Sequence, residues 1–244
     1  MKNFAIILST LLISSGLTER GPDITTKKLD LPEFHSIYVN SGYTVNLKQT
    51  NKQEVEVIAL TEIYEISEFV VKDGILHINV ELKNETKDKS VWEKIDNIKI
   101  SPEMTLNVSM RDIKVLKVNG SGKLLGQNSI ASNDLDLAVT GSGEMAVDVK
   151  GRNLNTSISG SGSLKIKGYA DYNDIKISGS GTLKAYGCEL TRAEVKVSGS
   201  GTCEINVTEK LEVTILGSGI VQHKGQTKNV TKKIYGSGEV KREY

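Results

Sequence analysis

Apolar and polar residues alternate over most of the chain after residue 113, and the alternation keeps step with a recurring Gly-Ser-Gly motif. The first glycine of the motif stands at Gly120, Gly141, Gly160, Gly179, Gly199, Gly217 and Gly236. The intervals between them are 21, 19, 19, 20, 18 and 19 residues. Alternation with a period of two predicts strands on both sides of each motif. A repeat of this length is too short for a strand–helix–strand unit, which needs about 30 residues, so we expect an all-β repeat.

The residues around each motif fall into columns when the repeats are aligned on the first glycine. Two positions before it every residue is a β-branched aliphatic, and four positions after it every residue is apolar. The first column holds Val118, Val139, Ile158, Ile177, Val197, Ile215 and Ile234, and the second holds Leu124, Met145, Leu164, Leu183, Cys203, Val221 and Val240. A third column, four positions before the glycine, is largely apolar and ends in Lys232. Such columns are typical of a solenoid, in which each turn stacks on the one before.

We therefore predict a parallel β-solenoid of about seven turns over residues 114–244, right-handed because parallel crossovers are nearly always right-handed. Both glycines of the motif have inward parity, which predicts a sharp bend without room for a Cβ atom. The competing topology is an antiparallel meander with a hairpin at each motif. The alternation continues through the motif without a break, and this favours stacking.

The N-terminal segment has the features of an export signal. A basic start at Lys2 is followed by an apolar run over residues 4–13, which is too short to span a bilayer stably. The small residues around Gly16 place signal cleavage after that residue, so we expect a signal peptide over residues 1–16 and a linker over residues 17–28. The alternative is a buried N-terminal strand or helix. Gly16 stands where a lipoprotein would carry cysteine, so no lipid anchor is expected there.

Residues 29–113 predict an irregular β region that caps the solenoid. Residues 36–47 look like a degenerate first turn, with Asn40, Ser41 and Gly42 in place of Gly-Ser-Gly. Residues 61–69 could form a short helix, and residues 69–80 predict two strands joined by an Asp-Gly turn. A cap is expected because the end of a solenoid otherwise exposes an unpaired edge.

Composition narrows the choice of function. The net charge is +1 at pH 7, which gives no electrostatic reason to expect nucleic acid or an anionic membrane as the main partner. No later segment has the length and apolar character of a transmembrane helix. Fourteen of the 23 glycines lie in the seven motifs, so the glycine excess marks repeated corners and not flexibility.

These features together resemble a known family. The export signal, the segment around Asn40–Tyr43, the Asp-Gly turn within Val71–Leu76 and the serial Ser-Gly-Ser-Gly-Ser/Thr-Leu motifs look like the head GIN domain family of auto-transporter adhesins, exported proteins typical of the Bacteroidetes cell envelope. The resemblance covers most of residues 30–240. It implies an exported, non-enzymatic β-solenoid without established catalytic residues. Many members are lipoproteins, and Gly16 departs from that pattern.

The residues that could carry metal or nucleophilic chemistry are few. None of His35, His77 and His223 lies at metal-ligand spacing from another histidine or a cysteine, so we expect no metal and no cofactor. Cys203 falls in an apolar column and is expected to be a buried thiol. Cys188 is expected at a polar bend, which disfavours a disulfide between the two. No serine stands in a nucleophile motif, so no catalytic residue is expected.

Three acidic residues are predicted to stack in consecutive turns. Asp174, Glu194 and Glu212 would lie about 4.8 Å apart along the rod and could bind Ca²⁺ or imitate the acidic cluster of a polysaccharide lyase. The neighbouring column holds Lys176 and Lys196, so a solvated ladder of ion pairs is the favoured interpretation.

Hydroxyl side chains form the most regular exposed feature. The middle serines of the motif have outward parity, and they are Ser121, Ser142, Ser161, Ser180, Ser200, Ser218 and Ser237. Such a ladder could bind sugar hydroxyls or order water, or its small residues could simply fit a tight corner and bond each other and the backbone. Near the C-terminal end Leu216, Ile220 and Tyr235 replace neighbouring hydroxyls. We expect these three to form a surface for docking or self-association.

The sequence as a whole predicts an exported, non-enzymatic protein of the periplasm, cell surface or medium that presents its Ser/Thr face to a glycan or protein ligand. A carbohydrate-active β-helix enzyme, a lyase or glycosidase, is a competing interpretation. This class needs an acid/base cluster beside aromatic sugar platforms, and the chain has 12 aromatic residues with none in a ladder. The hydroxyl face would also suit ice binding, and a stacked rod would suit a purely structural, self-assembling surface protein.

Overall fold

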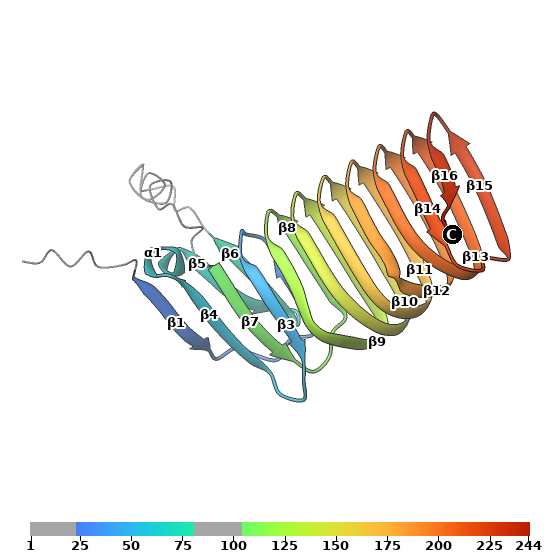
Figure 1. Ribbon diagram of the computed structural model, residues 1–244. Helices are drawn as coiled ribbons and strands as arrows, with labels where there is room; N and C mark the ends of the chain where they lie inside the picture. Colours follow the sequence, from blue (N-terminus) through green and yellow to red (C-terminus); the bar gives the residue numbers. More distant parts are fainter. Residues whose placement is uncertain (1–22, 81–103) are drawn as a thin grey trace, which may run out of the picture.

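The computed structural model describes residues 23–80 and 104–244, which form a rod of stacked strands (Figure 1). The expected signal peptide and residues 17–22 of the expected linker lie outside the described residues. The N-terminal elements are β1 (Ile24–Leu29), β2 (Ser36–Val39), β3 (Thr44–Gln49), β4 (Glu54–Leu60), α1 (Thr61–Glu65), β5 (Ser67–Lys72), β6 (Ile75–Val80) and β7 (Met104–Met110). The repeat elements are β8 (Val115–Gly120), β9 (Lys123–Gly141), β10 (Glu144–Gly160), β11 (Ser163–Gly179), β12 (Thr182–Gly199), β13 (Thr202–Gly217), β14 (Ile220–Lys224), β15 (Asn229–Tyr235) and β16 (Glu239–Arg242).

The repeat region is a parallel β-solenoid of about seven turns, as the sequence predicted. Each of β9 to β13 begins after one Gly-Ser-Gly corner, runs around a far bend and ends at the next corner. The first glycines of consecutive corners pair with one another in parallel register, for example Gly160 with Gly179. An antiparallel meander with a hairpin at each motif is ruled out, because the strands on either side of a corner pair with the next turn and not with each other.

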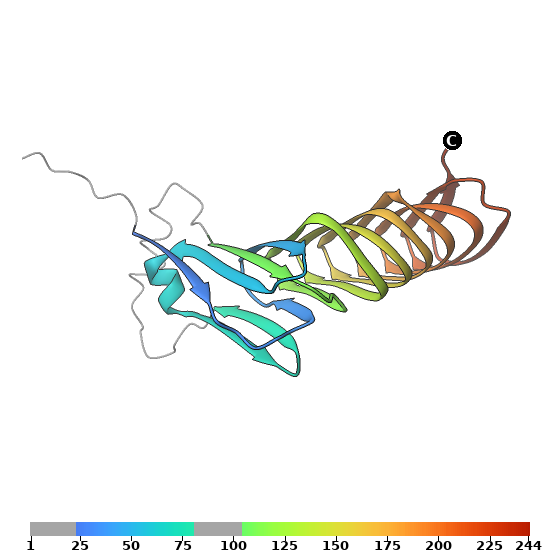
Figure 2. The same cartoon turned by 90° about the horizontal axis from the view of Figure 1, so that it is seen from below.

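The coils are flattened into two layers (Figure 2). We call the strand segments that lead into each corner the approach sheet, and those that leave it the return sheet. The N-terminal strands extend both layers: β2 and β6 continue the approach sheet from β8, and β3, β7 and β4 continue the return sheet from β9. Apolar columns from the two layers meet between them and form one core along the rod.

Residues 29–113 begin the stack and close its N-terminal end. The expected hairpin is present, with β5 and β6 antiparallel around Asp73 and Gly74, both at positive φ. The expected short helix is α1, which contributes buried Ile63. β1 pairs antiparallel with β4, so residues 24–28, which we expected in the linker, belong to a strand of the cap. No helix in the described part of the chain has the length and hydropathy of a membrane span.

The degenerate first turn exists, but its register is shifted by one residue from our alignment. Val39 pairs with Val118, and Thr44 pairs with Lys123, so Ser41, Gly42 and Tyr43 lie opposite Gly-Ser-Gly. Tyr43 therefore occupies the place of the second glycine. Its side chain is fully buried, and it contacts the ring of Phe69 edge to face at a centroid distance of 5.6 Å. A large ring fits only here, because the layer beneath is the irregular cap and not another corner.

The predicted core columns are buried. In the column two positions before the corner, every residue from Val118 to Ile215 is at most 1% exposed. The same holds in the column four positions after the first glycine, from Leu124 to Val221. At the last turn the residues of both columns are more exposed to solvent, and Ile234 is 40% exposed. One polar pair interrupts the core: the Thr156 hydroxyl donates to Oδ1 of Asn173 at 2.9 Å, and both side chains are buried.

Candidate functional site

The corner fixes the direction of its serine. The first glycine takes a φ between 94° and 130° in all seven corners, a conformation that L side chains rarely adopt. The backbone N–H of the serine then donates to the first glycine of the preceding corner, as from Ser161 to Gly141 at 2.9 Å. The second glycine is buried in the first six corners and half-buried at Gly238, whereas the first glycine is exposed or half-buried in every corner. Our expectation that both glycines face inward was therefore wrong for the first, because the bend turns it out of the core.

All seven corner serines are exposed and form one ladder along the rod. Within the described residues their hydroxyl groups make no hydrogen bond to each other or to the backbone. The positions beside the ladder carry further hydroxyls, which are exposed or half-buried: Thr140, Ser159, Ser178 and Ser198 on the approach sheet, and Ser163, Thr182 and Thr202 on the return sheet. We call the ladder and these seven residues the hydroxyl strip. Its polar groups are free to bind water or a ligand.

The hydroxyl strip ends at amide side chains near the cap and at apolar side chains near the C-terminal end. At the capped end Asn119 donates to Asn40 at 2.6 Å, and Asn40 donates to Asn79 at 2.9 Å. At the other end Leu216 and Tyr235 lie on paired strands and are 40% and 63% exposed, whereas Ile220 is only half-buried at the surface of β14. The structure thus places the three predicted interface residues close to the last corners.

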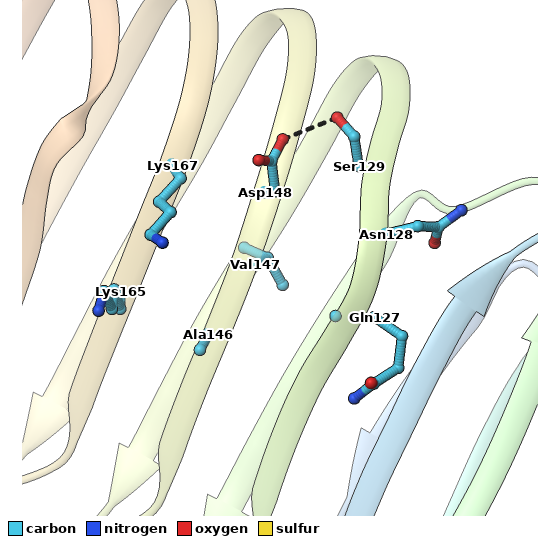
Figure 3. Close-up of a pocket in the computed structure, with 9 residues that line it drawn as sticks. Gln127, Asn128, Ser129, Ala146, Val147, Asp148, Lys165 and Lys167 are labelled. Atoms are coloured by element: carbon cyan, nitrogen blue, oxygen red, sulfur yellow. Dashed lines mark hydrogen bonds between the residues drawn. The ribbon is translucent and has the colours of Figure 1, made fainter.

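A shallow groove of about 320 Å³ lies on the outer surface of the return sheet (Figure 3). Between two successive paired positions, β9 has the three residues Gly126 to Asn128 where β10 has only one. These two extra residues create the groove, and they also lengthen the first repeat interval to 21 residues. The hydroxyl of Ser129 donates to Oδ1 of Asp148 at 2.7 Å, and Lys165 extends from the next turn. Asn128 points away from the groove and exchanges two hydrogen bonds with the backbone of Gln49, each 2.9 Å long.

A second groove of about 330 Å³ lies on the approach sheet. Its floor is formed by the short side chains of Ala138 and Ser157, which stand between longer side chains in the same column. Lys117 limits it on one side, with its ammonium group 5.5 Å from the ring centre of Tyr38. On the other side Lys176 forms an ion pair with Asp174 at 2.6 Å. We did not foresee either groove, although a repeat interval of 21 and a small-residue pair in a lysine column were visible signals.

Two of the three acids in the predicted column form ion pairs with lysines of their own strand, and the third, Glu194, accepts a hydrogen bond from the Tyr172 hydroxyl at 3.5 Å. Asp174 pairs with Lys176, and Glu212 pairs with Lys210 at 2.5 Å. The hydrogen bond from Lys210 lowers the pKa of Glu212. No group of three potential metal-ligating side chains comes together within residues 23–80 and 104–244. The acids are thus partnered on an open surface, but only Asp174 uses a lysine of the predicted neighbouring column, and Lys196 forms no ion pair within the described residues.

Both cysteines are free and buried. Cys203 lies in the apolar column as predicted, but Cys188 does not lie at a polar bend; it is 1% exposed. The reason is an extra residue in β12: Lys165 pairs with Lys184, whereas Lys167 pairs with Gly187, so inward parity shifts by one before Cys188 is reached. Burial raises the pKa of Cys188 to about 12, and it raises the pKa of Cys203 as well. Neither thiol is suited to be a nucleophile, which must be a thiolate.

Comparison with known proteins adds the family and the fold. The model of a family described as "Putative auto-transporter adhesin, head GIN domain" matches residues 33–227. A putative adhesin from Bacteroides fragilis has a similar structure, with 20% identity, a TM-score of 0.80, and coverage of 91% of this chain and 98% of its own. A putative adhesin from Parabacteroides distasonis has 24% identity and a TM-score of 0.71, covering 91% of this chain and 98% of its own. A protein from the same organism, described as a putative lipid binding protein, has 21% identity and a TM-score of 0.73, with coverage of 91% and 97%. No curated protein matches the sequence.

Proposed function

Because the chain belongs to the head GIN domain family, whose description is that of an adhesin, we propose that it is a non-enzymatic binding protein of the cell envelope that holds a surface glycan on its hydroxyl strip. The observation that carries this proposal is the ladder of seven exposed serine hydroxyls without partners in the described residues. If these serines were present only to fill a tight corner, we would expect their hydroxyls to bond the backbone. Here the backbone N–H groups close the corner, and the hydroxyls are left to the solvent.

The spacing of the hydroxyl strip suits a repetitive ligand. Parallel strands repeat every ~4.8 Å, so the strip offers a row of equivalent donors and acceptors at that interval. Each hydroxyl contributes a weak interaction, but several on one rigid rod act together on one polymer, and the overall affinity rises through effective concentration. A rigid scaffold also lowers the conformational entropy that binding must offset.

An enzyme of the lyase or glycosidase class is the weaker proposal. Such enzymes need a carboxylic acid and a carboxylate held at a set separation across a sugar-binding groove. The carboxylates that line the two grooves are Asp148 in the first and Asp136 and Asp174 in the second. They accept hydrogen bonds from Ser129, Asn155 and Lys176, respectively, and all three lie on an open surface.

We also propose that the protein is exported, on the basis of the N-terminal segment alone. Export predicts that the mature protein begins after Gly16, and N-terminal sequencing of the protein from cells would show this. A chain that retains Met1 or Lys2 in the cell fraction would contradict export. A mature protein that carries a lipid would contradict the expectation drawn from Gly16.

The glycan proposal is tested with two variants on a glycan array at fixed calcium concentration. In one variant Ser142, Ser161 and Ser180 are changed to alanine, and in the matched control Lys165 and Lys167 of the first groove are changed to methionine. We expect wild type and control to bind the same glycans, and the serine variant to lose at least ten-fold in affinity. Loss in the control alone would move the site to the groove. Failure of all three proteins to bind any glycan would refute the proposal and leave a structural role.

A further inference from the structure

The C-terminal end of the solenoid is an open edge. Within the described residues β15 pairs only with β13, and β16 pairs only with β14, so the outer side of both strands has no partner. All seven residues of β15 are exposed. The last corner keeps the geometry of the others, since a Cβ at Gly238 would lie 2.5 Å from Cγ2 of Ile215. The end is therefore shaped to receive one more strand.

The inward positions of this last turn are not all apolar. By register, Lys232 stands in the column of Val213, and Arg242 stands in the column of His223. The Lys232 ammonium group donates to the backbone oxygen of Val240 on the opposite layer at 3.3 Å, so its side chain crosses the end of the core. A guanidinium nitrogen of Arg242 donates to the backbone oxygen of Gly225 at 3.3 Å. Neither cation forms an ion pair within the described residues.

A buried imidazole lies beneath the two cations. His223 is 3% exposed, and its Nδ1 atom has no hydrogen-bond partner. The carboxylates nearby in sequence are engaged on the outside: Glu239 pairs with Lys241 at 3.0 Å, and Glu243 accepts from Gln222 at 3.1 Å. Nitrogen groups thus gather at the end of the core without a carboxylate among them.

We propose that this end is a strand-addition site for an extended segment of another protein that carries a carboxylate at an inward position. The unpaired edge of β15 supplies backbone hydrogen bonds, the half-open aliphatics Val230 and Ile234 receive apolar side chains, and Lys232 and Arg242 receive the carboxylate. Charge decides against a second copy as the occupant, although the sequence suggested self-association here. Two such ends placed face to face would bring four inward cations together in one core.

The probe is a seven-residue peptide with blocked ends and the sequence TVTETIT. It imitates β15 with glutamate in the place of Lys232, and its central glutamate meets Lys232 in either strand direction. The matched peptide TVTQTIT lacks only the charge. By fluorescence anisotropy we expect the glutamate peptide to bind the full chain at least ten-fold more tightly than the glutamine peptide. Hydrogen exchange should show new protection of the β15 amides when the glutamate peptide is bound.

Two protein variants locate the effect. Lys232→Met removes the inward charge and keeps most of the stem, and it should abolish the preference for glutamate. Lys233→Met removes an exposed, outward charge from the next position of the same strand, and it should keep that preference. Both side chains are exposed, so neither change should prevent folding. Circular dichroism and the thermal midpoint verify this.

Several results would overturn the proposal. Equal binding of the two peptides, or equal loss in the two variants, would remove the specific carboxylate site. Binding without protection of β15 would place the peptide elsewhere. If sodium acetate bound at Lys232 while neither peptide bound, the end would be an anion site without strand addition. If the wild type sedimented as a dimer in the absence of peptide, and Lys232→Met made that dimer more stable, the occupant would be a second copy of the chain.

Discussion

The second glycine of each corner should be limited by one methyl group of the preceding turn, and a double-mutant cycle can measure this. A Cβ at Gly181 would overlap Cγ2 of Ile158, far inside the 3.4 Å at which ordinary contact begins, and it would lie 3.0 Å from the backbone oxygen of Gly162. The φ of Gly181 lies outside the left-handed region, so its backbone accepts alanine. Ile158 is 1% exposed and β-branched, so it cannot easily turn away. We expect Gly181→Ala to cost about 3 kcal/mol, at the upper end of overpacking.

Ile158→Ala removes the Cγ2 atom and by itself should cost about 4 kcal/mol, as for other large-to-small changes in a core. The two changes together should cost about 5 kcal/mol and not the sum, because the new Cβ enters the space that the isoleucine leaves; the coupling is then about 2 kcal/mol. Ile158→Val keeps Cγ2, so its combination with Gly181→Ala should be additive within about 0.5 kcal/mol. Urea unfolding at 25 °C of the wild type and the five variants gives each value.

The first glycine supplies a second control for the same cycle. At Gly179 the φ is 105°, and a Cβ would lie 2.7 Å from the backbone oxygen of Gly160. No side-chain truncation relieves either constraint, so Gly179→Ala should remain additive with Ile158→Ala. Equal coupling at both glycines, or no coupling at Gly181, would refute the assignment of separate steric causes to the two glycines.

Three further predictions concern buried polar groups. Burial holds the pKa of His223 below its usual 6.5, so the folded state favours the neutral imidazole. The free energy of unfolding should therefore fall as the pH drops through 6.5, because the unfolded state binds the proton more readily. Measured by urea unfolding at several pH values, His223→Leu should remove this loss. A thiol reagent at mildly alkaline pH should leave Cys188 and Cys203 unmodified in the native protein and modify both in urea, because burial raises both pKa values. Thr156→Val should cost about 1–3 kcal/mol by leaving Oδ1 of Asn173 without its donor, whereas Thr156→Val with Asn173→Leu should restore stability; equal urea midpoints for the single and double variants would contradict this.

The corner and the core columns could be predicted because stacking repeats one environment in every turn. An inward position such as that of Ile158 is covered by Val139 on one side and Ile177 on the other, so its residue type is restricted in the same way in each repeat. The outward direction of Ser161 follows from the same parity. The hydrogen bonding of its hydroxyl does not, because it depends on whether the backbone N–H already closes the corner, as it does here.

Parity counting failed where one strand carries more residues than its neighbour. The extra residue before Cys188 turned an expected surface thiol into a core residue, and two extra residues after Leu125 created the first groove. At the cap the count was wrong by one at Tyr43, since a degenerate motif has no second glycine to fix the alignment. In β9 and β12 a bulge changes the number of residues without changing the number of layers, and the sequence shows only the number of residues.

The two bulges share a location, and the location has a physical cause. The extra residues in β9 and β12 lie between matched pairs on the return sheet, away from the corner. A corner cannot absorb an insertion, because its two glycines lie against the backbone oxygens and methyl groups of the preceding turn. The return sheet can, because a bulge there leaves the corner intact: two extra residues in β9 open a groove on the surface, and one extra residue in β12 turns Cys188 into the core. Surface shape in this solenoid is therefore set on the return sheet, while the corners keep the serines in line. Among proteins of this architecture, differences in binding should therefore correlate with the number of residues that each turn carries on the return sheet. The distance between stacked corners should stay the same.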